Sequence, residues 1–138
     1  MLVREIMSAR VVCVELDDRL SVVKEIFDRL KFHHLLVVES GQLQGVISDR
    51  DLLRALSPFI GTLSETTRDA NTLEKRVHQI MTRRPITVTS DAAVADAIGL
   101  FLNRQISCLP VVDAKNHPVG IVSWRDVLRS IGGATAST

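Results

Sequence analysis

One sequence pattern occurs twice, and this repeat is the feature that most constrains the fold. GVISDRDLLR at 45–54 recurs as GIVSWRDVLR at 120–129, and Ile6-Met7 recurs as Ile80-Met81. Two units of this size cannot easily each bury a full core. We therefore expect the repeats to pack on each other about a pseudo-two-fold axis. Their junction would then form two equivalent crevices, a usual place for small ligands.

Composition narrows the possible functions. The 138 residues fit one compact domain, with 46% apolar and 24% charged residues, as in globular proteins. A net charge of +1, 4% aromatic residues and no tyrosine argue against nucleic-acid binding, single strands included. The sequence lacks both a long apolar run and a signal-peptide pattern, so we expect no membrane insertion and a cytoplasmic location.

The two cysteines, Cys13 and Cys108, are too few for a disulfide framework. Both lie in apolar stretches. We expect both to be small buried hydrophobic side chains.

Hydrophobic periodicity predicts the order β-α-β-β-α in each repeat. In repeat 1 we expect a strand at 11–14, a helix carrying Leu20, Val23, Phe27 and Leu30 and capped by Asp17 or Asp18, strands at 35–38 and 43–48, and a helix at 49–56. In repeat 2 we expect strands at 86–89, 107–112 and 119–123, a helix capped by Ser90 or Asp91 between the first two, and a helix from about Trp124.

The predicted organisation is repeat 1 at 1–60, a linker at 61–71, repeat 2 at 72–131 and a frayed tail at 132–138. Asn71 and Glu74 have the spacing of a helix capping box at the start of repeat 2. The fold class is α+β.

A Ser-x-x-Asp element ends one strand of each repeat and begins the next helix. Ser48 with Asp51, and Ser123 with Asp126, would lie in the first helical turn, where backbone N–H groups favour anions. A carboxylate there can accept two hydrogen bonds from the vicinal hydroxyls of a ribose. The alternative is that Ser and Asp only cap the helix, and a duplicated fold would duplicate its caps.

These residues resemble a tandem pair of cystathionine-β-synthase-type (CBS) domains, also called a Bateman module. The resemblance rests on the two Gly-apolar-apolar-Ser-x-x-Asp elements, on IMS at 6–8 and IMT at 80–82, and on SCLPVVD at 107–113. It covers nearly the whole chain and implies adenosine-containing ligands: AMP, ADP or ATP, with S-adenosylmethionine or NAD as further candidates. No cofactor is required.

The resemblance also implies two composite sites, each combining a Ser-Asp element with strands of the other repeat. One would use Ser48, Arg50, Asp51, Arg84, Ile86, Ile106, Ser107 and Cys108. The other would use Ser123, Arg125, Asp126, Arg10, Val12, Phe32, His33 and His34. The aspartates would hold ribose, serine and arginine would contact phosphate, and apolar side chains would enclose adenine.

The two predicted sites differ in sequence. His33-His34 stands where repeat 2 has Ser107-Cys108, and Asp49 stands where repeat 2 has Trp124. Adjacent residues of an extended segment point to opposite sides, so the histidine pair does not predict a metal site. Unequal affinities are expected.

Two functions fit these observations. The first is a regulatory, nucleotide-sensing module that acts on a separate effector protein, unknown from the sequence, or through its own assembly. The second is a homodimeric scaffold with empty clefts, whose surface would include Leu52, Leu53, Leu56, Val127, Leu128 and Ile131. A homodimer is expected in either case. No combination of nucleophile, base and acid is present, so we expect no enzyme activity.

Overall fold

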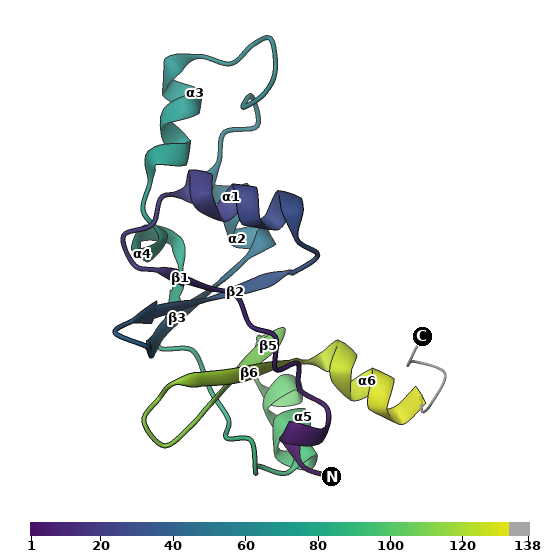
Figure 1. Ribbon diagram of the computed structural model, residues 1–138. Helices are drawn as coiled ribbons and strands as arrows, with labels where there is room; N and C mark the ends of the chain where they lie inside the picture. The colour runs from purple at the N-terminus through teal and green to yellow at the C-terminus, as the bar shows by residue number, and fades with distance from the viewer. Residues whose placement is uncertain (133–138) are drawn as a thin grey trace. The chain divides into compact units, whose positions relative to one another are not determined.

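The computed structural model describes residues 1–132. The expected tail, apart from Gly132, lies outside the described residues. The chain divides into two compact units (Figure 1). The first-sheet unit comprises Val12–Ser40 and Gln44–Arg84. The second-sheet unit comprises Met1–Val11, Gly41–Leu43 and the chain from Pro85 onward.

Helices and strands alternate along the chain in a mixed α+β order. The strands are β1 (Cys13–Glu15), β2 (His34–Glu39), β3 (Gln42–Ser48), β4 (Thr82–Arg83), β5 (Cys108–Val112) and β6 (Pro118–Ser123). The α-helices are α1 (Leu20–Arg29), α2 (Asp49–Ala55), α3 (Thr67–Asn71), α4 (Val77–Ile80), α5 (Val94–Asn103) and α6 (Trp124–Gly132), and the 3₁₀ helices are η1 (Val3–Glu5) and η2 (Thr72–Glu74).

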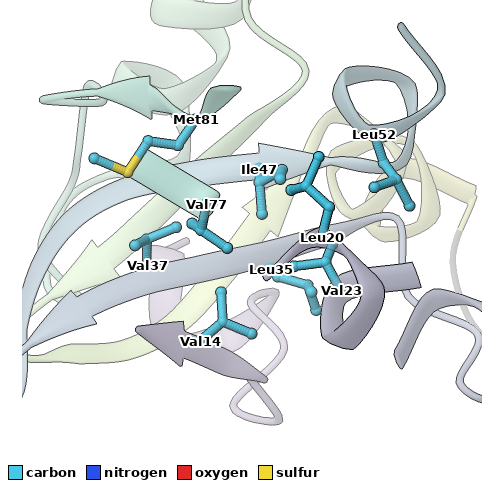
Figure 2. Packing of buried hydrophobic residues seen from close by; sticks show 9 residues of the cluster. All are labelled: Val14, Leu20, Val23, Leu35, Val37, Ile47, Leu52, Val77 and Met81. Carbon is cyan, nitrogen blue, oxygen red and sulfur yellow. The ribbon is translucent and has the colours of Figure 1, made fainter. Parts of the chain in front are cut away.

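The first-sheet unit is built on a four-stranded sheet in the order β1-β2-β3-β4. Strand β1 runs parallel to β2, and β4 runs antiparallel to β3. Ser40 and Gly41 both have positive φ angles, 51° and 79°, as a tight hairpin turn between β2 and β3 requires. The buried side chains in Figure 2 come from β1, α1, β2, β3, α2 and the segment Val77–Met81: Val14, Leu20, Val23, Leu35, Val37, Ile47, Leu52, Val77 and Met81.

The second-sheet unit repeats this plan in reduced form. Strands β5 and β6 form an antiparallel hairpin. In place of flanking strands, the hairpin has one isolated bridge on each strand: Val88 pairs in parallel with Val111 on β5, and Ser8 pairs antiparallel with Ile121 on β6. The expected strand at 86–89 is therefore only this one bridge. The core contains Val3, Val88, Ala97, Leu109, Val111 and Val122.

Each unit is completed by residues from the beginning of the other repeat. Val77, near the start of repeat 2, is fully buried in the first-sheet unit, and Val3, at the start of repeat 1, is fully buried in the second-sheet unit. Full burial of one valine contributes about 1.5–3 kcal/mol. The compact units thus differ from the sequence repeats, and the repeat boundaries given above stay predictions.

The segments that each repeat contributes to the other repeat's unit, here called the exchanged segments, also cap the helices α1 and α5. They show that our capping predictions for these helices were wrong. Leu20 N donates to Lys75 O at 2.9 Å, and Val94 N donates to Met1 O at 2.9 Å. The residues before the helices, Arg19 and Ala93, make no side-chain cap. Backbone carbonyls satisfy these N–H groups, so Asp17, Asp18, Ser90 and Asp91 are not the caps that the sequence suggested.

Two further predictions were wrong. The capping box before repeat 2 is formed by Thr66 and Asp69 at α3, whereas Asn71 makes no side-chain cap. Cys13 is exposed on β1, and only Cys108 is buried. Partial burial and the charge of Glu15 raise the pKa of the Cys13 thiol.

Substituting Gly45 or Gly120 with alanine tests the packing of the exchanged segments. A Cβ on Gly45 would lie 2.7 Å from Thr82 O, and a Cβ on Gly120 would lie 2.9 Å from Ser8 O. We expect Gly45→Ala and Gly120→Ala each to lower the free energy of unfolding by about 1–3 kcal/mol, measured by urea denaturation.

Gly99→Ala is the matched control. A Cβ on Gly99, inside α5, meets nothing within 4 Å, so this variant should be about 0.5–1 kcal/mol more stable than the wild type. Equal effects at all three glycines would contradict the proposed close packing.

Candidate functional site

The first candidate corner lies where β3 becomes α2. Ser48 N donates to Asp51 Oδ2 at 2.9 Å, and Asp51 N donates to Ser48 Oγ at 3.1 Å. These two bonds form a reciprocal capping box in partly buried surroundings. They fix the carboxylate of Asp51 in the first helical turn.

The second candidate corner, where β6 becomes α6, has nearly the same geometry. Ser123 N donates to Asp126 Oδ2 at 2.8 Å, and Asp126 N donates to Ser123 Oγ at 3.3 Å. Arg129 adds an ion pair to Asp126 Oδ1 at 3.3 Å, and the side chain of Asp126 is 16% exposed. Both repeats therefore hold one aspartate in the same way.

The capping interpretation of these residues is confirmed, and it leaves acceptor sites for a ligand. Each box uses the Oδ2 atom of its aspartate. A carboxylate has about four lone-pair sites. The cap bond uses one of them on Asp51, whereas Asp126 accepts from Ser123 N, Ser123 Oγ and Arg129 and keeps fewer sites for a ligand. A fixed carboxylate can bind ribose hydroxyls without first losing side-chain entropy.

In the first-sheet unit, the residues before β2 contact the first corner. His33 Nδ1 lies 3.0 Å from Asp49 Oδ2, and Asp49 N donates to His33 O at 3.0 Å. The pKa of His34 is lowered, mainly because burial disfavours the imidazolium and also because His33 is close, although the charges of Asp49 and Asp51 act in the opposite direction. Two imidazoles thus lie beside the start of α2.

The second-sheet unit brings the corresponding residues together. Cys108 pairs with Ser123 across the β5–β6 hairpin, which places Ser107-Cys108 beside the start of α6. Cys108 is buried and Ser107 is exposed. In both units, then, the segment before the hairpin lies next to the helix start of its own repeat.

The remaining predicted site residues divide between the two units. Arg84, with a φ of 50° and its N–H donating to Gln44 O, belongs to the first-sheet unit with Val12 and Phe32. Arg10, Ile86 and Ile106 belong to the second-sheet unit, where the two isoleucines pack against the core. Each predicted composite site draws on both units, so the assembly of either site stays a prediction.

A separate hollow of about 250 Å³ opens in the first-sheet unit, at the C-terminal ends of β1 and β2. Its lining contains none of the predicted site residues and consists of Glu15, Leu16, Asp17, Glu39, His78 and Arg83. The corners at Asp51 and Asp126 therefore remain the candidate functional site.

Two features are absent from residues 1–132. In this part of the chain, no helix is long and apolar enough to cross a membrane. Across the same residues, no group of three or more His, Cys, Asp or Glu side chains is arranged to hold a metal ion.

The chain belongs to the CBS domain family, whose pattern matches residues 3–58 and 77–133. A CBS domain-containing protein of Dictyostelium discoideum is 34% identical over 129 residues, covering 92% of this chain and 88% of the relative. An uncharacterized protein of Methanocaldococcus jannaschii is 32% identical over 130 residues, but the chain spans only 43% of its length.

Solved CBS structures share the fold. The structure of CBSX2, an Arabidopsis thaliana protein, in complex with AMP matches with a TM-score of 0.78 and 28% identity, covering 97% of this chain and 98% of CBSX2. The CBS domain pair of protein MJ0100, in complex with 5′-methylthioadenosine and S-adenosyl-L-methionine, matches with a TM-score of 0.76 and 28% identity, covering 96% of this chain and all of that pair.

Unfolding at different pH values tests the partial burial of His34. Its lowered folded-state pKa means that the unfolded chain binds more protons just below the ordinary value of about 6.5. The stabilisation is thus present above about pH 6.5 and is lost as the pH falls toward the folded pKa. We expect the free energy of unfolding, measured in urea between about pH 5 and pH 7.5, to fall with acidification, and to fall less in His34→Gln.

His33→Gln is the control, because it changes the exposed neighbour and leaves the partly buried imidazole of His34 in place. It should retain the pH dependence that arises from His34. Wild-type behaviour in His34→Gln would show that burial of this imidazole does not affect stability.

Proposed function

We propose that the protein is a regulatory module that binds adenosine-containing ligands, with one corner in each repeat. The observation that carries this proposal is the duplicated Ser-Asp arrangement, in which the same two bonds orient a carboxylate at Asp51 and at Asp126. Two related structures of the same fold were solved with AMP or with methylthioadenosine and S-adenosylmethionine, which supports the ligand class.

In this proposal Asp51 and Asp126 bind the vicinal hydroxyls of the ribose. Each hydrogen bond to a charged group contributes about 1.5–3 kcal/mol. Ser48 with Arg50, and Ser123 with Arg125, lie at the same helix starts and would contact phosphate groups. AMP, ADP and ATP are the proposed ligands, with S-adenosylmethionine and NAD as further candidates.

We further propose that each corner uses the residues before the hairpin of its own repeat. The contact between His33 and Asp49 supports this grouping in repeat 1, and the pairing of Cys108 with Ser123 supports it in repeat 2. The predicted contributions of the opposite repeat, such as Arg84 with Ile86 and Arg10 with Val12, stay part of the proposal.

The proposed role is regulation without catalysis, in the cytoplasm. A ligand shifts the equilibrium between two arrangements of the repeats only by its difference in affinity for them. Affinities from micromolar to millimolar, about −8 to −4 kcal/mol, suffice to sense abundant adenylates. The response would pass to a separate effector protein or through self-assembly.

A thermal-shift screen with AMP, ADP, ATP, S-adenosylmethionine and NAD tests the proposed function. At about 100 times its Kd, a ligand that binds only the native state adds about 2.7 kcal/mol per site. For a protein of this size, the melting temperature should rise by about 10 °C per occupied site. Asp51→Asn and Asp126→Asn should each remove one site's share of this rise.

Asparagine keeps an oxygen that can accept the cap bond, so these variants separate ligand loss from unfolding. Asp69→Asn makes the same change in the Thr66–Asp69 capping box at α3 and should leave the ligand-induced rise unchanged. If none of the five ligands raises the melting temperature, the proposed function is wrong.

An exposed apolar stripe on α6 favours a second candidate function, assembly into a homodimer. Trp124, Leu128 and Ile131 follow one another at helical spacing and are 49%, 53% and 74% exposed. Leu53 on α2 is also exposed, whereas Leu52 and Val127, which were expected on this surface, are buried. The scaffold hypothesis therefore rests on a smaller surface than the sequence suggested.

Leu128→Glu tests the dimer. A charge in the centre of the α6 stripe would be desolvated without a partner in a dimer interface, so we expect a monomer by sedimentation velocity where the wild type is a dimer. Leu102→Glu, at an 80% exposed leucine on α5, is the control and should leave the dimer intact. A wild-type monomer, or an unchanged dimer in Leu128→Glu, would contradict the proposed interface.

A further inference from the structure

The two candidate corners carry different charges. Arg50 and Asp51 of repeat 1 correspond to Arg125 and Asp126 of repeat 2, but Asp49 occupies the position of Trp124. The start of α2 thus has one carboxylate more than the start of α6. The second corner has one acidic side chain, Asp126, which is already paired with Arg129.

Contacts from a second element hold the additional carboxylate at the corner. Asp49 Oδ2 lies 3.0 Å from His33 Nδ1, and the Asp49 N–H donates to the carbonyl of the same histidine at 3.0 Å. Asp49 therefore has a side-chain and a backbone contact to the residues that precede β2. The side chain is 41% exposed, so a ligand at this corner can approach it.

His33 compensates this charge only in part. Its side chain is 60% exposed, and ion pairs between exposed groups contribute little in water. The other charged or titratable groups at this corner are His34, the first residue of β2, and Arg50 and Asp51 on α2. Two carboxylates within the first turn of α2 disfavour a further negative charge near the ribose.

We propose that Asp49 is a specificity-determining residue that makes the first corner select adenosine ligands without a phosphate chain, such as a nucleoside thioether or sulfonium. This inference rests on the proposed function, because it requires a ribose at Asp51. The second corner lacks the additional carboxylate and accepts nucleotides that bear phosphates. The protein therefore senses two chemically different ligands, one at each repeat.

The expected size of the effect follows from Coulomb's law. A carboxylate and a phosphate about 8 Å apart change a binding constant by about 2- to 30-fold, depending on the effective dielectric constant. A ligand without charge on its 5′ substituent, such as 5′-methylthioadenosine, should be insensitive to Asp49. The ratio of the affinities for ATP and methylthioadenosine isolates the charge effect from general damage to the site.

Isothermal titration calorimetry with ATP and with 5′-methylthioadenosine tests the inference. All proteins in this experiment carry Asp126→Asn, which removes binding at the second corner. The double variant with Asp49→Asn is compared with the single variant Asp126→Asn, so that only the first corner is observed. We expect Asp49→Asn to raise the affinity for ATP by about 2- to 30-fold and to leave that for methylthioadenosine unchanged. The gain should shrink at high ionic strength.

Trp124→Asp in the background Asp51→Asn is the reciprocal variant. It places the additional carboxylate at the second corner and should weaken ATP binding there by a similar factor. Circular dichroism checks that each variant is folded, and Asp49→Asn carries the test if Trp124→Asp does not fold.

The outcomes separate the two proposals. If methylthioadenosine binds and Asp49→Asn leaves the affinity ratio unchanged, the inference about Asp49 is overturned while the proposed function stands. If neither ligand binds to any of these proteins, the inference is overturned, and the proposed function fails as well when none of the five screened ligands raises the melting temperature.

Discussion

Close backbone packing at two glycines is the constraint on which both sheets depend. Hydrogen atoms at Gly45 and Gly120 leave room for Met81-Thr82 and Met7-Ser8 to lie directly against the hairpins. The chain next to these segments places Val77 and Val3 in the two cores. Its backbone carbonyls also accept the first N–H groups of α1 and α5, so these helices have no side-chain caps. The glycine of each Gly-apolar-apolar-Ser motif therefore packs against the methionine of an Ile-Met motif.

The same stretch of chain links packing to binding. In each repeat, the glycine lies three residues before the serine of the capping box, within one strand that leads into the helix. The strand fixes the serine, and the box fixes the aspartate. A ligand corner built in this way is preorganised by the backbone, whereas the neighbouring residues, His33 and Asp49 or Ser107 and Trp124, are able to differ between repeats and to set ligand preference.

The sequence predicted the parts of the fold that depend on local periodicity and on the repeat. The helix with Leu20 and Val23 and the strands expected at 35–38 and 43–48 are present, and the alternative interpretation of Ser48 and Ser123 as capping residues is confirmed. The exchange of segments was missed, since nothing local in Val77 or Val3 indicates which sheet will bury it. The capping predictions at Asp18 and Asp91 failed for the same reason, because the actual partners are backbone carbonyls distant in sequence.

The candidate site shows a similar division. Its aspartates and serines could be found from the repeat, because one short motif carries both members of each box. The contact between His33 and Asp49 joins residues on different elements, and the sequence gives no pairing rule for such side chains. The grouping of site residues across repeats depends on how the two units meet, which no local pattern specifies.

The exchanged segments also dictate an order of events on the ribosome. Residues within the first eleven form backbone hydrogen bonds with Ile121 and with the start of α5. These bonds can form only after most of the chain has been synthesised. The first-sheet unit likewise lacks Val77 and Met81 until the second repeat has begun to emerge. Neither sheet can be completed by the residues of one repeat alone, and an isolated repeat expressed on its own would expose an incomplete core to aggregation or to exchange with another copy.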